Sequence, residues 1–235
     1  MQWDRTLQTW QTIRSSVFAR HSHDRAYAAL VLSGSYEEAG DHGRFKVEAG
    51  DTVLHGRFEA HVNRFSGSCA VVLNLALPME TSFLPGPATI ADPDLIVRLA
   101  ERNREQAARL LLSSIIERKP GHEDWPDELA SALVVNPSLS LLRWSESKGL
   151  MPWTVSRGFM QVFGISPAAF RARTRAHRAW NTLTASEEPL AAIAADLGFA
   201  DQSHMTRSVK QLTGMTPQMC RNAANGFKTQ RGIRL

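Results

Sequence analysis

Three histidines near the start of the chain have the residue type and spacing of a ligand-binding or metal-binding site. His21 and His23 are separated by one serine, and side chains two positions apart in a β-strand point to the same face. His61 follows a later apolar run, and three imidazoles that converge inside a β domain could bind Zn²⁺, Fe²⁺, Ni²⁺ or Mn²⁺. The same rings could instead be hydrogen-bonded core residues or line the pocket of an organic ligand. The sequence therefore predicts a small-ligand site at His21, His23 and His61, with a divalent metal as one alternative occupant.

Other catalytic chemistry has no pattern to support it in the sequence. Cys69 and Cys220 are the only cysteines, and neither has neighbours that would activate a thiolate or complete a zinc site. The sequence contains no Gly-x-Ser-x-Gly, Walker or Gly-x-Gly-x-x-Gly segment. We therefore expect a protein that is not an enzyme and that has no certain cofactor.

A second set of candidate residues lies in an internal repeat over residues 139 to 217. Each copy has a short apolar segment with a small residue, a glycine four residues later, a second amphipathic segment and a Gly-x-Ser/Thr-Pro ending. The small residue, Ser145 or Ala194, lets two helices approach, and Gly149 or Gly198 can adopt the left-handed conformation that ends the first helix. Each copy is therefore predicted to be a helix-turn-helix.

The polar face of each second helix predicts the residues that contact DNA. Arg157 and Arg207 occupy equivalent positions in the two copies, and arginine is the side chain best shaped to bond guanine through two donors. Arg173 and Lys210 are predicted to contact phosphates. The full predicted set is Trp153, Ser156, Arg157, Arg173, Gln202, Ser203, His204, Thr206, Arg207 and Lys210.

The charge of the chain is divided between its two halves. Residues 1–130 hold 14 Lys and Arg against 18 Asp and Glu, a net charge of −4, whereas residues 131–235 hold 13 against 5, a net charge of +8. A concentrated positive charge is expected of a domain that binds phosphates. No apolar run is long enough to span a membrane and the start lacks a signal peptide, so we expect a cytoplasmic protein.

These elements predict an α+β protein with three parts. Short apolar runs between Tyr27 and Leu77 alternate with glycine turns, which is typical of an antiparallel β domain, and Pro85-Gly86-Pro87 is expected to close it. We expect helix over residues 94–118, broken near Asn103, and again over Asp127 to Val135. The predicted parts are a β sensor domain at 1–90, a helical connector at 91–130 that could form a dimer seam, and an all-α domain with two helix-turn-helix units at 131–235.

The run from Gly198 to Arg207, followed by Gly214-Met215-Thr216-Pro217, resembles the C-terminal signature of the AraC/XylS family of bacterial transcription regulators. The resemblance covers about residues 125 to 222. It implies that a long helix, here Pro167 to Leu183, joins the two units, that both second helices enter successive major-groove segments about 34 Å apart, and that the connector dimerises. In the first unit Met151 precedes Pro152 where the family commonly has serine.

The histidine regions resemble the two motif regions of the cupin fold, a β-barrel that commonly precedes the DNA-binding part in this family. The metal-binding cupin pattern has a glutamate four or five residues beyond the second histidine, and this sequence has none there. The resemblance implies a cupin-like barrel that senses a small ligand.

The sequence therefore predicts a sequence-specific DNA-binding transcription regulator. Its expected partners are promoter or operator DNA, a small-molecule effector, RNA polymerase and a second copy of the chain, with no membrane. The alternatives are a cupin-type metal-dependent enzyme with a DNA-binding tail, a methyl-transfer repair protein and an architectural DNA binder.

Overall fold

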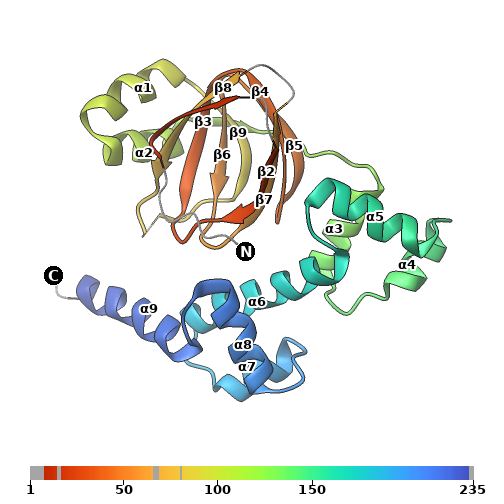
Figure 1. Cartoon of the computed structure of the whole chain (residues 1–235). Helices are drawn as coiled ribbons and strands as arrows, with labels where there is room; N and C mark the ends of the chain where they lie inside the picture. The colour runs from red at the N-terminus through yellow and green to blue at the C-terminus, as the bar shows by residue number, and fades with distance from the viewer. Residues whose placement is uncertain (1–7, 15–16, 66–68, 80, 233–235) are drawn as a thin grey trace. The chain divides into compact units, whose positions relative to one another are not determined.

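The computed structural model describes residues 8–14, 17–65, 69–79 and 81–232, with side chains described as far as residue 225. The chain divides into two compact units. One comprises Met1–Ser131 with Arg157–Ile165, and the other comprises Ala132–Ser156 with Ser166–Leu235. The strands all belong to the first unit, and the helices of the C-terminal half form most of the second (Figure 1).

The first unit contains two antiparallel sheets. The six-stranded sheet has the order β1 (Trp10–Arg14), β8 (Cys69–Ala76), β3 (Tyr27–Ser33), β6 (Asp51–His55), β9 (Gly86–Ile90) and β10 (Ile115–Arg118). The four-stranded sheet has the order β2 (Val17–Ser22), β7 (Ala60–Phe65), β4 (Ser35–Gly40) and β5 (Gly43–Glu48). The predicted antiparallel β domain is confirmed, as two sheets rather than a closed barrel.

Alternation along the strands gives the six-stranded sheet two buried faces. Ala29 and Val31 of β3 belong to a core shared with Tyr36 and Phe45 of the four-stranded sheet. Ala28 and Leu30 point the other way, into a second core. Side chains of successive strand residues alternate between faces, so one strand serves both cores.

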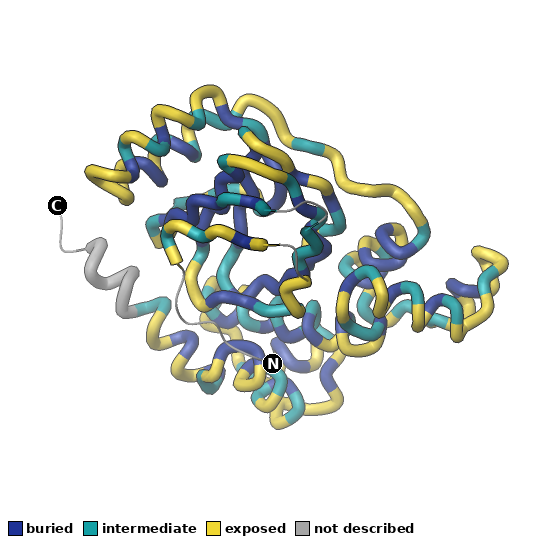
Figure 2. Tube along the Cα trace, turned by 45° about the horizontal axis from the view of Figure 1, so that its top comes forward, coloured by how far each residue is buried: buried dark blue, intermediate teal, exposed yellow. Residues whose placement is uncertain are grey.

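Helices α1 (Pro93–Arg102) and α2 (Arg104–Ser113) cover the second core (Figure 1). Ile96, Ala100 and Leu111 are buried against the sheet, while the outer faces of both helices are exposed (Figure 2). Asn103 breaks the helix as predicted: its backbone N–H bonds to Leu99 O at 2.7 Å, and its side chain accepts from Gln106 N at 3.0 Å.

Two predictions about the end of the β domain are wrong. Pro85-Gly86-Pro87 does not close the sheet, because Gly86, with a φ of +111°, is the first residue of β9 and Pro87 lies opposite Val53. The helix does not reach residue 118, because residues 115–118 return to the sheet and pair with β9. The six-stranded sheet therefore extends past residue 90 to Arg118.

The segment that follows β10 is attached to β5, the edge strand of the four-stranded sheet. His122 N donates to Arg44 O at 2.7 Å, and the Arg44 guanidinium bonds to Asp124 at 2.6 Å and to Asp127 at 2.9 Å. Burial, followed by the hydrogen bond with Asp124, raises the pKa of Asp127 to about 7. This network fixes the first turn of the next helix, α3 (Trp125–Val135).

The rest of the described chain is helical, as predicted. Its helices are α4 (Leu141–Ser147), α5 (Pro152–Phe163), α6 (Pro167–Ala185), α7 (Leu190–Asp196), α8 (Gln202–Thr213) and α9 (Pro217–Gly232). Ala179 and Leu183 of α6, Ile193 of α7 and Met205 and Val209 of α8 share one core. Among the described residues, no helix combines the length and apolar character that crossing a membrane requires.

Candidate functional site

The second helix-turn-helix is formed by α7 and α8. Gly198, with a φ of +69°, makes the turn, and Asp201 caps α8 by accepting from His204 N at 2.6 Å. Helix α8 ends at Gly214, whose φ of +75° is the left-handed conformation that glycine adopts without strain. Met205, Val209 and Leu212 are buried, so the opposite face of the helix is fixed outward.

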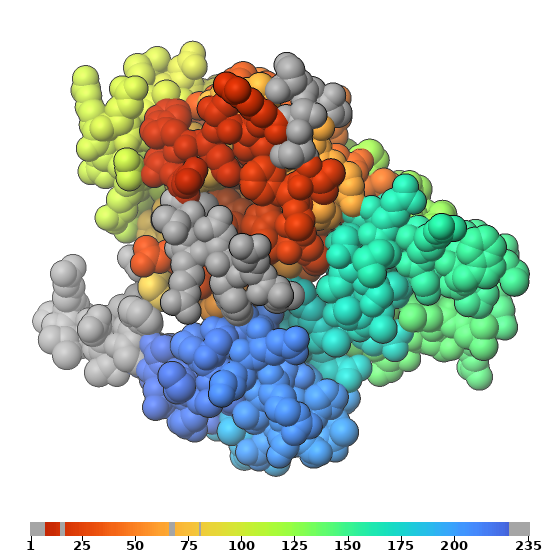
Figure 3. Space-filling model, viewed as in Figure 1, coloured from red at the N-terminus to blue at the C-terminus, as the bar shows by residue number. Residues whose placement is uncertain are grey.

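The predicted DNA-contacting residues of α8 lie on that outward face. Gln202, Ser203, Arg207 and Lys210 are exposed. Thr206 and His204 are half-buried, and the His204 ring packs edge-on against Phe199 with centroids 5.3 Å apart. Residues of α7 and α8 contribute the blue surface of the space-filling view (Figure 3).

The first helix-turn-helix is formed by α4 and α5. It has the same kind of turn as the second, but its first helix begins with a side-chain cap. Ser140 caps α4 by accepting from Arg143 N, and Gly149, with a φ of +65°, makes the turn. Trp153, Ser156 and Arg157 are exposed on α5, as predicted. The inward residues of α5, Val155, Phe159 and Phe163, are buried.

The assignment of Arg173 to a DNA phosphate is contradicted by its burial. Arg173 is only 7% exposed on α6, because it lies on the same face as buried Phe170, Ala176 and Ala179. Periodicity could have revealed this, since residues three or four apart share one helix face. A neighbouring arginine also has a structural partner, as Arg175 donates to Gly198 O at 3.1 Å and lies over the Phe199 ring.

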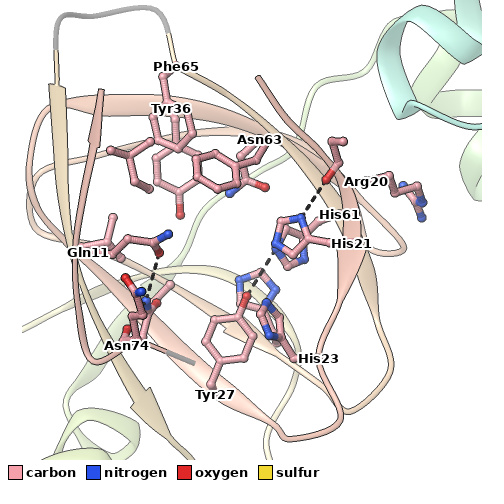
Figure 4. A pocket seen from close by; sticks show the side chains of 17 residues that line it. Gln11, Arg20, His21, His23, Tyr27, Tyr36, His61, Asn63, Phe65 and Asn74 are labelled. Atoms are coloured by element: carbon pink, nitrogen blue, oxygen red, sulfur yellow. Dashed lines mark hydrogen bonds between the residues drawn. The ribbon is translucent and has the colours of Figure 1, made fainter. Parts of the chain in front are cut away.

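A cavity of about 530 Å³ lies within the β unit, which is the compact unit that contains both sheets (Figure 4). One end is polar and holds the three predicted histidines with His55 and the Tyr27 hydroxyl. The remaining wall mixes aromatic and amide side chains, from Phe18, Tyr36, Phe65, Gln11, Asn63 and Asn74. Such a cavity matches the size and mixed lining of small-molecule sites.

The structure brings His21, His23 and His61 together. His21 lies opposite His61 in the register of β2 and β7, and one possible ligand atom from each of the three residues lies within 4.8 Å of the others. His21 Nδ1 donates to Ala19 O at 2.9 Å, which in the neutral ring leaves Nε2 as an acceptor. Tyr27 stands four residues beyond His23, and its hydroxyl bonds to His61 Nε2 at 3.3 Å.

Two further residues of this cluster were missed by the sequence analysis. Glu38 on β4 and His55 at the end of β6 form a second group with His61 whose possible ligand atoms also lie within 4.8 Å of one another. Strand parity was a signal for Glu38, because it shares its face of β4 with buried Tyr36. For His55 the signal was an imidazole that ends a fully buried strand.

Burial controls the protonation of this group. It raises the pKa of Glu38 well above its ordinary value, and the nearby charge of Glu59 acts in the same direction. It also lowers the pKa values of His55 and His61 well below that of a free imidazole, with neighbouring histidines adding to the effect. The carboxyl and both rings are therefore favoured in their neutral forms when no counter-charge is present.

A protein family described as a helix-turn-helix domain matches residues 144–223. The chain is also similar to solved structures. The C-terminal domain of AraT, a response regulator from Geobacillus stearothermophilus, is 23% identical over 42% of this chain and 84% of its own, with a TM-score of 0.39. ToxT from Vibrio cholerae is 10% identical over 92% of this chain and 98% of its own, with a TM-score of 0.43. No protein of curated function matches the chain.

The matched domain, with two helix-turn-helix units that follow an antiparallel β domain in the chain, defines a DNA-binding transcription regulator. The predicted helix-turn-helix domain is confirmed over residues 144–223, where the family model matches.

Proposed function

We propose that this regulator reads a promoter with the outward faces of α5 and α8 while the cavity of the β unit binds a small effector. The observation that carries the proposal is the equivalent exposure of Arg157 and Arg207 on two helices whose apolar faces are buried. Both belong to the half of the sequence with a net charge of +8. As a regulator of genes, the protein would act in the cytoplasm, and RNA polymerase is its proposed partner there.

Five of the exposed residues have a proposed task. Arg157 and Arg207 would each bond one guanine, Gln202 suits adenine, and Trp153 offers an apolar surface to a thymine methyl. Lys210 would contact a phosphate and add affinity without sequence preference. The half-buried His204 and Thr206 would shape the surface beside Arg207.

The effector is proposed to bind in the cavity through its histidine end and its aromatic wall. An organic molecule with a flat or apolar body would pack on Tyr36 and Phe65, and its polar group would reach His21, His23 and His61. The effector regulates only if it binds one state of the protein more tightly than another, and a coupling of about 1–3 kcal/mol would change DNA affinity by about 5-fold to 150-fold.

A homodimer remains part of the proposal, although its predicted seam is largely occupied. Leu99, Leu110, Leu111 and Ile115 pack in the core of the β unit, whereas Leu95 is 41% exposed. A dimer through α1 would therefore use its outer face. Sedimentation of the full chain at micromolar concentration, with and without DNA, tests it, and a monomer in both conditions would exclude it.

The promoter proposal is tested by recovering the DNA fragments that the full-length protein binds across the genome. We expect a shared sequence element in the recovered fragments, and loss of that element when Arg207→Ala protein is used. Recovery of fragments without a common element would instead indicate an architectural DNA binder.

The effector proposal is tested by the double replacement of His23 and His61 by alanine, with circular dichroism to verify the fold. We expect promoter output to stop responding to the growth condition that changes it in the parent. A parent-like response would assign the histidines a structural role and leave the DNA-binding proposal intact. Product formation from candidate substrates by the metal-loaded parent would favour the enzyme alternative.

A further inference from the structure

Glu38, His55 and His61 form a buried group on three neighbouring elements of the β unit. Glu38 lies on β4, His55 ends β6 and His61 lies on β7, and each is 5% exposed or less. His55 and His61 also line the cavity. Buried carboxyl and imidazole groups are costly unless hydrogen bonds or a bound ion satisfy them.

Hydrogen bonds within the described structure satisfy this group incompletely. His61 Nδ1 is buried and has no hydrogen-bond partner among the described residues. The closest approach of Glu38 to His55, 3.7 Å from Oε1 to Nδ1, is too long for a hydrogen bond. His61 Nδ1 is therefore an unsatisfied atom of this group, and one ligand atom from each of the three residues lies within 4.8 Å of the others.

Hydrogen bonds from neighbouring residues orient Glu38 and His61, as such bonds commonly orient the ligands of a metal ion. Glu38 Oε2 accepts from Asn63 Nδ2 at 3.3 Å, which leaves Oε1 available. If His61 Nε2–H donates to the Tyr27 hydroxyl, Nδ1 carries the free electron pair. Metal-bound histidines generally donate their second N–H in this way, which orients the ring.

We propose that Glu38, His55 and His61 bind one divalent transition metal ion, of the Zn²⁺ or Fe²⁺ type, in the wall of the cavity. Two imidazoles and one carboxylate are the ligands of catalytic zinc sites and of non-haem iron sites, which keep a coordination position open. This deepens the proposed effector function and rests on it for its biological meaning, because an open position facing the cavity would bind a donor atom of the effector.

Charge and burial favour this group over His21, His23 and His61. Ligand atoms around a tetrahedral zinc ion are about 3.3 Å apart, so separations of up to 4.8 Å require both groups to contract by small side-chain movements. The group with Glu38 includes a carboxylate that compensates a buried dication, whereas three neutral imidazoles do not. His21 is also more exposed than any member of the buried group.

The test uses the full-length chain without a polyhistidine tag, freed of metal by a chelator and titrated with Co²⁺, whose visible absorption reports tetrahedral or five-coordinate binding. We expect one equivalent to bind and Zn²⁺ to displace it. Glu38→Gln and His55→Gln should each weaken binding by at least about tenfold. The matched control His21→Gln/His23→Gln, and His42→Gln outside both groups, should stay within about threefold of the parent.

Absence of Co²⁺ binding by the parent would overturn the proposal, as would loss of binding in His21→Gln/His23→Gln with Glu38→Gln unchanged. X-ray absorption of the Co²⁺-loaded parent needs no variant to fold. Two imidazoles with a carboxylate oxygen would support the assignment, and three imidazoles would overturn it. Metal binding without sequence-specific DNA binding would support the metal site and overturn the proposed regulator function, while specific DNA binding without metal binding would do the reverse.

Discussion

The two helix-turn-helix units have the same sequence pattern but different structural support. Helix α8 has a side-chain cap at Asp201, a left-handed glycine at its end and a core formed with α6 and α7. Residues Arg157–Ile165, which comprise the second half of α5 and the turn after it, instead group with the β unit. A repeat in the sequence therefore predicts that the two units have the same shape, but it does not predict that the same contacts stabilise them.

The contacts of α5 with the β unit are specific. The Arg20 guanidinium donates to Phe163 O at 3.1 Å, and Arg64 donates to Gln161 O. These carbonyls belong to the last turn of α5, and the carbonyl groups of a helix's last turn have no N–H donor within the helix itself. Arg20 precedes His21 in β2 and also lines the cavity. The end of α5 is therefore held by the unit that contains the cavity, whereas α8 is held by α6 and α7. Four predictions test this contrast.

The largest effects are expected from the two equivalent arginines. Arg207→Ala should cost about 1–3 kcal/mol of binding free energy on the correct site and relax the preference at one base position. Arg157→Ala should act similarly but less, because its helix has Met151 rather than a hydroxyl residue before Pro152. Fluorescence anisotropy with single-base variants of the site measures both. Lys210→Ala is the control and should weaken binding to all sequences alike; unchanged affinity in both arginine variants would refute base reading.

Gly158→Ala should destabilise the β unit by about 1–3 kcal/mol. Helix propensity alone predicts a gain of about 1 kcal/mol. However, a Cβ at residue 158 would lie 2.5 Å from Cζ2 of Trp125, and the ring would have to move. Urea denaturation measures the change.

Ser208, the equivalent residue of α8, provides the control, and Ser208→Ala should leave the stability of the β unit unchanged. Adding Trp125→Leu to Gly158→Ala should recover part of the loss. A stabilised Gly158→Ala protein would show that α5 does not depend on this close packing.

Exchanging the helix caps should narrow the difference between the units. Asp201→Ala removes the cap of α8 and should cost about 1 kcal/mol of stability. Met151→Ser supplies a hydroxyl before α5 and should raise the free energy of unfolding by about half of that amount. Thermal denaturation and DNA affinity check both changes. If Asp201→Ala left the melting temperature unchanged and Met151→Ser did not raise it, the caps would not explain a difference in stability between the two helix-turn-helix units.

A further difference should be a pH dependence confined to the attachment of α3. An aspartate normally loses its proton near about pH 4, whereas burial raises the pKa of Asp127 to about 7. Between these values the folded chain keeps a proton that the unfolded chain has released. Stability from this group is therefore complete below about pH 4 and is lost as the pH rises through about 7.

Asp127→Asn stays neutral and should flatten that slope, measured by denaturation at several pH values between about 4.5 and 7.5. The pKa of Asp124 is lowered, mainly by its hydrogen bond with Asp127, so Asp124 stays ionised across this window. If Asp127→Asn showed the same dependence of stability on pH as the parent, Asp127 would not be its cause.

Much of the architecture could be predicted from local sequence patterns. The glycines at 149 and 198 and the small residues before them identified both turns, because a sharp turn between packed helices restricts those positions. Residues 115–118 were mistaken for helix, since Ile115 continues the apolar spacing of α2. Their pairing with β9 is a contact between distant segments, which periodicity does not contain.

In the candidate site, too, the residues in local sequence patterns could be predicted, and those brought together only by the fold could not. His21, His23 and His61 were found because they lie in recognisable local patterns, and the register of β2 and β7 brought them together. Glu38 and His55 have no such pattern, and their approach depends on how two sheets face each other. Arg173 was misplaced because composition was read along α6 without regard to which face is buried.

The return of the chain to the sheet at β10 also determines where this regulator could be cut or fused. A gene fusion that ended the sensor at residue 90 would leave β9 with an open edge of unpaired backbone groups and remove α1 and α2 from an apolar face, both of which favour aggregation. It would also remove Lys119, whose ammonium group bonds to Asp51 at 2.5 Å. A transferable sensor module must therefore extend beyond Lys119, and because His122, Asp124 and Asp127 bond to Arg44 of β5, it must also include the first turn of α3.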